Sequence, residues 1–204
     1  MSPLALAAAL IAGALTSPPG EAGGPVVLVS GGDRFGSGVV WDAEQGLVLT
    51  ALHVVERMEE IRLTVPGEAP QAARLVDVDA RLDLALVRAE SGRLGGAARS
   101  ARAAALPRSG EAARLVGYPG GTAAAAAGTI LEPSRRFAGA SYLAVGVRAG
   151  PGASGGPVLD ARGEVVGIVD LVLTGPGITL AVPVEAALAR FPRALRPPGR
   201  LAAE

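Results

Sequence analysis

The sequence predicts an all-β fold, either a sandwich or a barrel. From Val26 onward, apolar runs of about four to eight residues recur, and their Val, Leu and Ile content is typical of strands. Gly, Pro and Asp separate these runs at short intervals, as turn residues do in all-β proteins. The length of 204 residues suits one compact domain of two lobes, or two small barrels.

The strand-like runs follow one another along most of the chain. They are 26–30, 38–42, 46–55, 61–65, 84–88, 113–119, 142–147, 156–160, 164–173 and 178–184. "DARGEVVGI" predicts a hairpin with Gly163 at its turn. The alanine-rich stretch 122–128 favours helix by composition, but it lies between two strand-like runs, so a loop or a plain strand fits equally well. "VPVEAALARFP" predicts a terminal helix.

These patterns divide the chain into four segments. Residues 1–24 are interpreted as a signal peptide and spacer, because Leu4 to Leu15 is an apolar run of only about 18 Å as a helix. No Arg or Lys precedes that run, so a buried N-terminal helix remains the alternative. We expect a first barrel and linker in 25–110, a second barrel and terminal helix in 111–192, and a tail in 193–204. The chain is then exported, to the periplasm or outside the cell.

The composition excludes several kinds of chemistry. The chain has no cysteine, which excludes a thiol nucleophile, a disulfide framework and a thiolate metal site. It has no lysine, so a P-loop, a Schiff base and a Ser–Lys dyad are excluded. Its single histidine, His53, excludes a histidine-cluster zinc site. The formal net charge is zero, and nothing indicates a nucleic-acid or membrane-surface partner.

Three residues together point to acyl transfer. His53 follows an apolar strand, Asp83 opens another, and Ser154 lies among the glycines of "GPGASGGPVLD". Alone, each has an ordinary structural explanation: a core or surface histidine, a strand-end cap and a tight turn. In acyl transfer, however, a histidine takes the serine proton and a carboxylate orients the histidine. The order His, Asp, Ser along the chain is the one found in the chymotrypsin class.

With these residues the chain resembles the chymotrypsin-like serine proteases, and among them the HtrA/Deg-type bacterial branch. The stretches that carry the resemblance are "GSGVVWDAEQGLVLTALHVVE" (36–56), "DLALVR" (83–88), "VGYPGG" (116–121), "PGASGGPVLDARGEVVGI" (151–168) and "TLAVPV" (179–184). The resemblance implies two six-stranded antiparallel β-barrels with the site in the cleft between them. It also implies a serine endopeptidase that forms an acyl-enzyme intermediate.

The resemblance assigns roles by position. His53 would be the general base, Asp83 its orienter and Ser154 the nucleophile. The backbone N–H groups of Gly152 and Ser154 would form the oxyanion hole. Ala153 stands where the family often has Asn or Asp, but the hole should survive because its donors are backbone groups.

The sequence gives fewer clues to the substrate pocket. Its walls would come from Gly167 to Leu171, including Ile168, Val169 and Asp170, and from the loop 147–152. Arg148 would favour acidic substrate side chains if it pointed inward, although burial of an unpaired arginine is costly. Asp170 could pair with Arg148 and leave a small or neutral pocket.

The expected partner is a polypeptide substrate, with no cofactor, no metal, no nucleic acid and no membrane span in the mature chain. HtrA/Deg-type proteins usually carry a PDZ domain after the protease, whereas only about a dozen residues follow Phe191 here. Two alternatives stay open: a catalytically idle peptide-binding or regulatory module on the same fold, and an unrelated all-β domain. The sequence leaves the oligomeric state, the physiological substrate and the preferred cleavage residue undecided.

Overall fold

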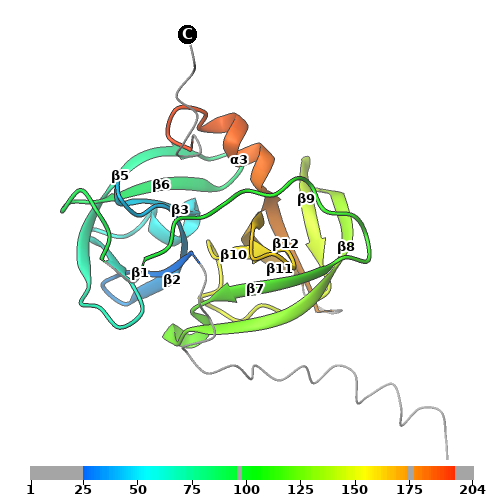
Figure 1. Ribbon diagram of the computed structural model, residues 1–204, viewed down its shortest axis with the longest axis horizontal. Coiled ribbons are helices and arrows are strands. Elements are labelled where there is room, and N and C mark those ends of the chain that lie inside the picture. Colours follow the sequence, from blue (N-terminus) through cyan, green and yellow to red (C-terminus); the bar gives the residue numbers. More distant parts are fainter. Residues whose placement is uncertain (1–24, 96–97, 174–176, 196–204) are drawn as a thin grey trace, which may run out of the picture.

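The chain folds into two closed six-stranded antiparallel barrels that lie side by side, with a short helix against them (Figure 1). The computed structural model describes residues 25–95, 98–173 and 177–195. The predicted all-β class and the double barrel are both confirmed. The N-terminal leader expected in residues 1–24 lies outside the described residues.

The first barrel is built from strands whose order around the barrel is β1-β2-β3-β6-β5-β4. Their bounds are β1 Val26–Gly31, β2 Arg34–Asp42, β3 Leu47–Ala51, β4 Ile61–Thr64, β5 Gln71–Asp79 and β6 Leu84–Ala89. A single-turn helix, α2 (Leu52–Val55), follows β3 directly. The pairing of β1 with β4 closes the barrel.

The second barrel repeats this arrangement in the order β10-β11-β12-β9-β8-β7. Its strands are β7 Ala112–Gly117, β8 Ala124–Phe137, β9 Ala140–Val145, β10 Pro157–Leu159, β11 Val165–Leu173 and β12 Ile178–Pro183. A 3₁₀ turn, η2 (Pro119–Gly121), follows β7, and helix α3 (Val184–Arg190) follows β12. The alanine-rich stretch is therefore the start of strand β8 rather than a loop, and the expected terminal helix and the β10–β11 hairpin are present.

Between the barrels the chain runs without helix or strand in the described residues of 90–111, apart from an isolated parallel bridge between Ala103 and Val165. This segment carries the chain from the first barrel to the second. It lays the linker along β11, so that the second barrel is tied to the segment that enters it.

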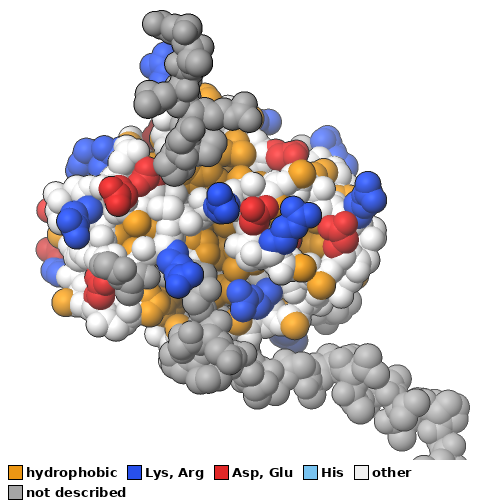
Figure 2. Space-filling model, viewed as in Figure 1, with side chains coloured by type: hydrophobic (Ala, Val, Ile, Leu, Met, Phe, Trp, Pro, Cys, Tyr) orange, Lys and Arg blue, Asp and Glu red, His pale blue; other side chains and the backbone are white. Residues whose placement is uncertain are grey.

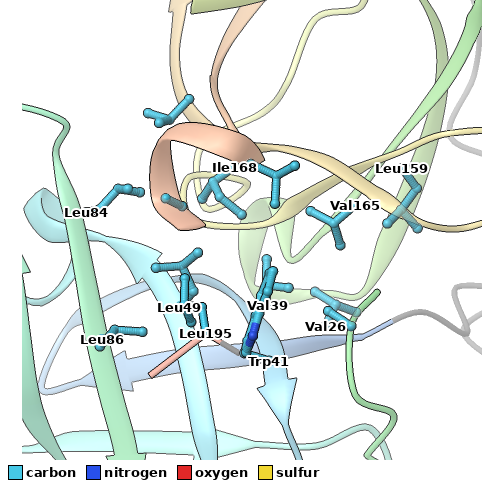
Figure 3. Close-up of a cluster of buried hydrophobic side chains, with 14 of the residues drawn as sticks. Val26, Val39, Trp41, Leu49, Leu84, Leu86, Leu159, Val165, Ile168 and Leu195 are labelled. Atoms are coloured by element: carbon cyan, nitrogen blue, oxygen red, sulfur yellow. The ribbon is translucent and has the colours of Figure 1, made fainter. Parts of the chain in front are cut away.

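Each barrel has its own apolar interior, and a third cluster joins the two. The joining cluster contains Val39, Trp41 and Leu49 from the first barrel and Leu159, Val165 and Ile168 from the second (Figure 3). Phe191 and Leu195, beyond helix α3, extend it. Because burial of apolar surface stabilises by about 25 cal/mol per Å², this shared core holds the barrels in a fixed relation. A site at the junction can then draw rigidly on both.

On the face seen in Figure 2, arginine and acidic side chains are interspersed, and apolar side chains lie in patches between them. Within the described residues, no helix has the length and apolar character needed to span a bilayer.

Candidate active site

Strand register brings His53 and Asp83 together. Ala51, at the end of β3, pairs with Leu84, at the start of β6, so the residues just beyond these strand ends are neighbours. His53 is the second residue of α2, and Asp83 is the last residue of the turn before β6. One carboxylate oxygen of Asp83 accepts a hydrogen bond from the His53 Nδ1 and the other accepts one from the His53 backbone N–H at 3.0 Å.

This contact determines the form of the imidazole. A carboxylate only accepts, so Nδ1 carries the proton and Nε2 is left as the acceptor of the neutral ring. The Asp83 hydrogen bond, together with the negative charges of Asp83, Asp170 and Glu56, raises the pKa of His53 against the opposing effect of burial. The His53 side chain is 43% exposed, so the ring is accessible from solvent.

The backbone of Asp83 is strained. Its φ of 52° lies in the left-handed region, which is uncommon for a residue other than glycine. The conformation is held from both sides of the turn, since the Asp83 carbonyl also accepts from the Leu52 N–H at 2.9 Å. Such strain gathers at sites where a side chain must be aimed.

Ser154 lies on a loop in which the neighbouring positions must be glycine. Gly152 (φ 96°) and Gly155 (φ 82°) flank it in the left-handed region. A Cβ on Gly152 would approach the Phe35 ring and the Tyr118 carbonyl to 2.5 Å. A Cβ on Gly155 would collide with the Ser37 carbonyl oxygen. Only glycine therefore allows this backbone to pass so close to the first barrel.

The loop leaves two amide groups available. Within the described part of the chain, the N–H groups of Gly152 and Ser154 donate to no protein acceptor, while those of Ala153, Gly155 and Gly156 are all engaged. Ala153 donates to Gly150 at 3.1 Å, and its side chain is buried. Free amides before and after Ala153, in the loop that carries Ser154, are the kind of donors that bind a negatively charged oxygen.

Ser37, on β2, fastens this loop to the first barrel. Its hydroxyl donates to the Gly152 carbonyl at 2.7 Å and accepts from the Tyr118 N–H at 2.9 Å. Its backbone N–H donates to the Ser154 carbonyl at 2.8 Å. Ser37 was not among the residues predicted for the site, although it stands between two glycines in the stretch 36–56.

Asp170 occupies a different place from the one expected of a pocket wall. Its carboxylate lies 3.9 Å from the His53 Nδ1, and its backbone carbonyl accepts a hydrogen bond from the Ser154 hydroxyl at 3.2 Å. One residue of β11 therefore contacts the histidine on one side and the serine on the other. The Tyr142 hydroxyl, from β9, interacts with the Asp170 carboxyl, and Tyr142 was not among the residues predicted for the site.

A pocket of about 490 Å³ opens beside Ser154. Apart from Ser154, its lining consists mostly of small or apolar residues from β7, β8, β11 and the loop that precedes Ser154. These are Leu115, Val116, Gly117, Pro119, Ala124, Ala126, Ala149, Gly150, Pro151, Ala153, Val172 and Leu173. Arg148 also borders it, with an exposed side chain.

The structure revises part of the expected pocket. Ile168 and Val169 are each only 1% exposed and pack in the apolar cores, so their side chains do not form the wall that we expected. The pairing of Asp170 with Arg148 is absent from the described residues, where Asp170 faces His53, Asp83 and Tyr142 instead. Along β11 the wall comes from residues further on, Val172 and Leu173.

His53, Asp83 and Asp170 each offer one ligand-type atom within 4.8 Å of the other two. In the described residues they are the only such group of three. The hydrogen bond between Asp83 and His53 already uses the Nδ1 of this group, so its geometry serves a proton better than a cation.

Two closed six-stranded barrels that meet at such a site have the chymotrypsin-like fold. A solved structure of an HtrA-type protease, an AlgW variant with a tripeptide, shares it with a TM-score of 0.76 and 23% identity, covering 88% of this chain and 64% of that one. A family model described as a trypsin-like peptidase domain matches residues 36–168. The chain belongs to this trypsin-like peptidase family, as the sequence motifs predicted.

The similar curated proteins are of the DegP and HtrA kind. A probable periplasmic serine endoprotease, DegP-like, of Ectopseudomonas mendocina is 34% identical over 162 residues, which is 76% of this chain and 34% of that protein. Serine protease HTRA4 of Homo sapiens is 30% identical over 158 residues, 74% of this chain and 33% of that protein. The chain spans about one third of the length of these relatives.

Proposed function

We propose that the protein is a serine endopeptidase that hydrolyses peptide bonds through an acyl-enzyme on Ser154. The observation that carries this proposal is the hydrogen-bonded pair of His53 and Asp83, which leaves the His53 Nε2 unprotonated, together with the two free amides in the loop of Ser154. The family and the DegP and HtrA relatives support the same reaction class.

The reaction begins with a rotation of the Ser154 hydroxyl away from the Asp170 carbonyl to the unprotonated Nε2 of His53. His53 takes the proton while the Ser154 oxygen attacks the substrate carbonyl carbon. Asp83 stabilises the imidazolium that forms, and the amides of Gly152 and Ser154 bind the oxyanion. His53 then returns the proton to the leaving amine, and a water molecule repeats the sequence to release the acid and free Ser154.

The substrate is an extended polypeptide. Small and apolar residues line the pocket beside Ser154, so an uncharged, small or aliphatic side chain suits it before the cleaved bond. Arg148 keeps its guanidinium in solvent and contributes little to the choice. We place the protein outside the cytoplasm, since its apolar N-terminal run fits an export signal and several relatives are named periplasmic.

Digestion of a peptide library, with sequencing of the cut sites, tests both reaction and preference. We expect cleavage after uncharged small or aliphatic residues, no cleavage by Ser154→Ala, and an unchanged preference in Arg148→Ala. Cleavage by the Ser154→Ala variant at the wild-type rate would refute the assignment of the nucleophile.

The second candidate is an idle peptide-binding module on the same fold. It is favoured by the resting hydrogen bond of Ser154, which points to a backbone carbonyl. A serine-directed fluorophosphonate separates the two functions. Labelling of Ser154 that is lost in His53→Ala indicates the enzyme, and a folded sample that takes no label indicates the module.

A further inference from the structure

Asp170 is placed by an irregularity of its strand. The register of β11 against β12 shifts between Val169 and Leu171, so Asp170 is the extra residue of a β-bulge. Bulges re-aim one side chain and are over-represented beside active sites. Here the bulge turns a carboxyl, only 7% exposed, away from solvent and into the junction between the barrels.

The carboxyl meets the rest of the catalytic centre there. It lies 3.9 Å from the His53 Nδ1, and one of its oxygens lies within 4.8 Å of an Asp83 oxygen, so the two carboxyls interact. Burying an ionised carboxyl without a positive neighbour costs free energy. A buried carboxyl beside a second carboxyl therefore usually has a raised pKa and keeps its proton. The cost would select against an aspartate here if a neutral side chain served equally well.

We propose that Asp170 is a positioning residue of the catalytic centre, a second carboxyl that supports Asp83 and whose charge sets the pH at which His53 becomes a base. This inference rests on the proposed function and adds a residue whose role is exerted through Asp83 and His53. Asp170 would act without touching the substrate bond.

The charges around Asp170 are consistent with this role. Burial, followed by the charge of Asp83, raises the pKa of Asp170 to about 6, and the Tyr142 hydroxyl and the His53 charge act in the opposite direction. Burial and the Asp170 charge raise the pKa of Tyr142 to about 12, so Tyr142 remains a neutral donor. The further charge acting on His53 is that of Glu56, on the solvent side.

Two regimes follow. At acidic pH, Asp170 is protonated and donates to Asp83, which leaves His53 beside one net negative charge. As the pH rises, Asp170 loses its proton and a second negative charge faces the imidazole, which favours the imidazolium. The pKa of His53 is therefore higher than Asp83 alone would make it, and activity begins at a higher pH.

The single histidine allows a direct measurement. The imidazole Cε1–H resonance of His53 can be titrated by NMR in the full chain carrying Ser154→Ala, which prevents self-digestion. We expect Asp170→Asn to lower the pKa of His53 by about one pH unit, the scale of one nearby charge. Tyr142→Phe should lower it less, because the loss of its hydroxyl makes Asp170 harder to ionise.

Glu56→Gln is the matched control, since it removes one carboxylate near His53 from an exposed position. We expect a shift of no more than about 0.3 pH unit from it, because solvent screens such a charge. Shifts of Asp170→Asn and Glu56→Gln that are equally small would overturn the proposal and leave Asp170 a structural residue.

Two further readouts cover other outcomes. If Asp170→Asn fails to fold, Asp170→Ser replaces it, with the same expected fall in the pKa of His53; an unchanged pKa in the folded variant contradicts the proposal. In active enzyme, the acidic limb of kcat/KM should move to lower pH by the same amount in Asp170→Asn. Absence of hydrolysis in the parent enzyme would instead refute the proposed function, because the NMR result does not depend on turnover.

Discussion

The two halves of the site are held in different ways. On the first barrel, His53 and Asp83 are positioned by side-chain hydrogen bonds at paired strand ends. On the second barrel, Ser154 is positioned by backbone: two left-handed glycines, and amides left free by the turns around them.

This difference predicts how each half fails. The side chain of His53 or Asp83 can be replaced by one of the same shape, so the chemistry is lost while the fold remains. On the second barrel, an added methyl group meets the Phe35 ring or the Ser37 carbonyl, so geometry is lost together with chemistry. The following predictions test that contrast, from the largest effect to the smallest.

Ser154→Ala should lower kcat/KM by a factor on the order of 10⁶, because the nucleophile acts as a unit with its base. The side chain is only half-buried and makes one hydrogen bond, so thermal unfolding should be unchanged. Residual steady-state hydrolysis and a melting curve measure both. A large fall in the melting temperature would mean that Ser154 also has a structural role.

Asp83→Asn should lower kcat by about 10⁴, since an amide can donate to Nδ1 and favour the wrong imidazole tautomer. The raised pKa of His53 depends first on Asp83, so the pKa should fall toward 6.5 or below. In a raised-pKa histidine the associated stability is present below pH 6.5 and is lost as the pH rises through the folded pKa. In Asp83→Asn this loss between acidic and neutral pH should be smaller, as unfolding at pH 5 and pH 8 would show. Equal pH dependence in both proteins would argue against the ion pair.

Gly152→Ala should lower kcat/KM by about 10²–10³, because it displaces one oxyanion donor. Gly163→Ala is the matched control: Gly163 also has a positive φ, of 79°, but no atom lies within 4 Å of an added Cβ. It should cost about 1–2 kcal/mol of stability and no activity. If both variants lost activity equally, the effect would come from strain in general and the oxyanion assignment would fall.

Ser37→Ala should destabilise the fold by about 1–3 kcal/mol, since it leaves buried backbone groups of Gly152 and Tyr118 without a partner. Its effect on kcat should be about tenfold, through the looser loop. The control Ser91→Ala removes an exposed hydroxyl and should change stability by less than about 0.5 kcal/mol. Denaturant unfolding compares them; similar losses would mean that Ser37 does not fasten the loop.

The sequence was sufficient for the features that depend on local pattern. Short apolar runs predicted the strands, and the glycines around Ser154 predicted a bent loop. The order His53, Asp83, Ser154 singled out a histidine and a carboxylate that the fold joins by a hydrogen bond. These signals are strong because strands require runs of apolar residues and a left-handed backbone requires glycine, and both can be read in the sequence.

The features that were missed depend on tertiary placement. Asp170 was expected to line a pocket from its position in the family pattern, and that pattern does not reveal the bulge that turns Asp170 to His53. Ser37 and Tyr142 act through partners far away in sequence, 115 residues in the case of Ser37 and Gly152. The alanine-rich start of β8 could not be distinguished from a loop, because alanine has little preference that survives tertiary pairing.

The most direct measurement is the mass of the intact protein after brief reaction with a p-nitrophenyl ester. The account predicts a burst of nitrophenol with one acyl group per chain, located on Ser154 and absent from Ser154→Ala and His53→Ala. An acyl group on another residue, or a folded protein that acquires none, would contradict it.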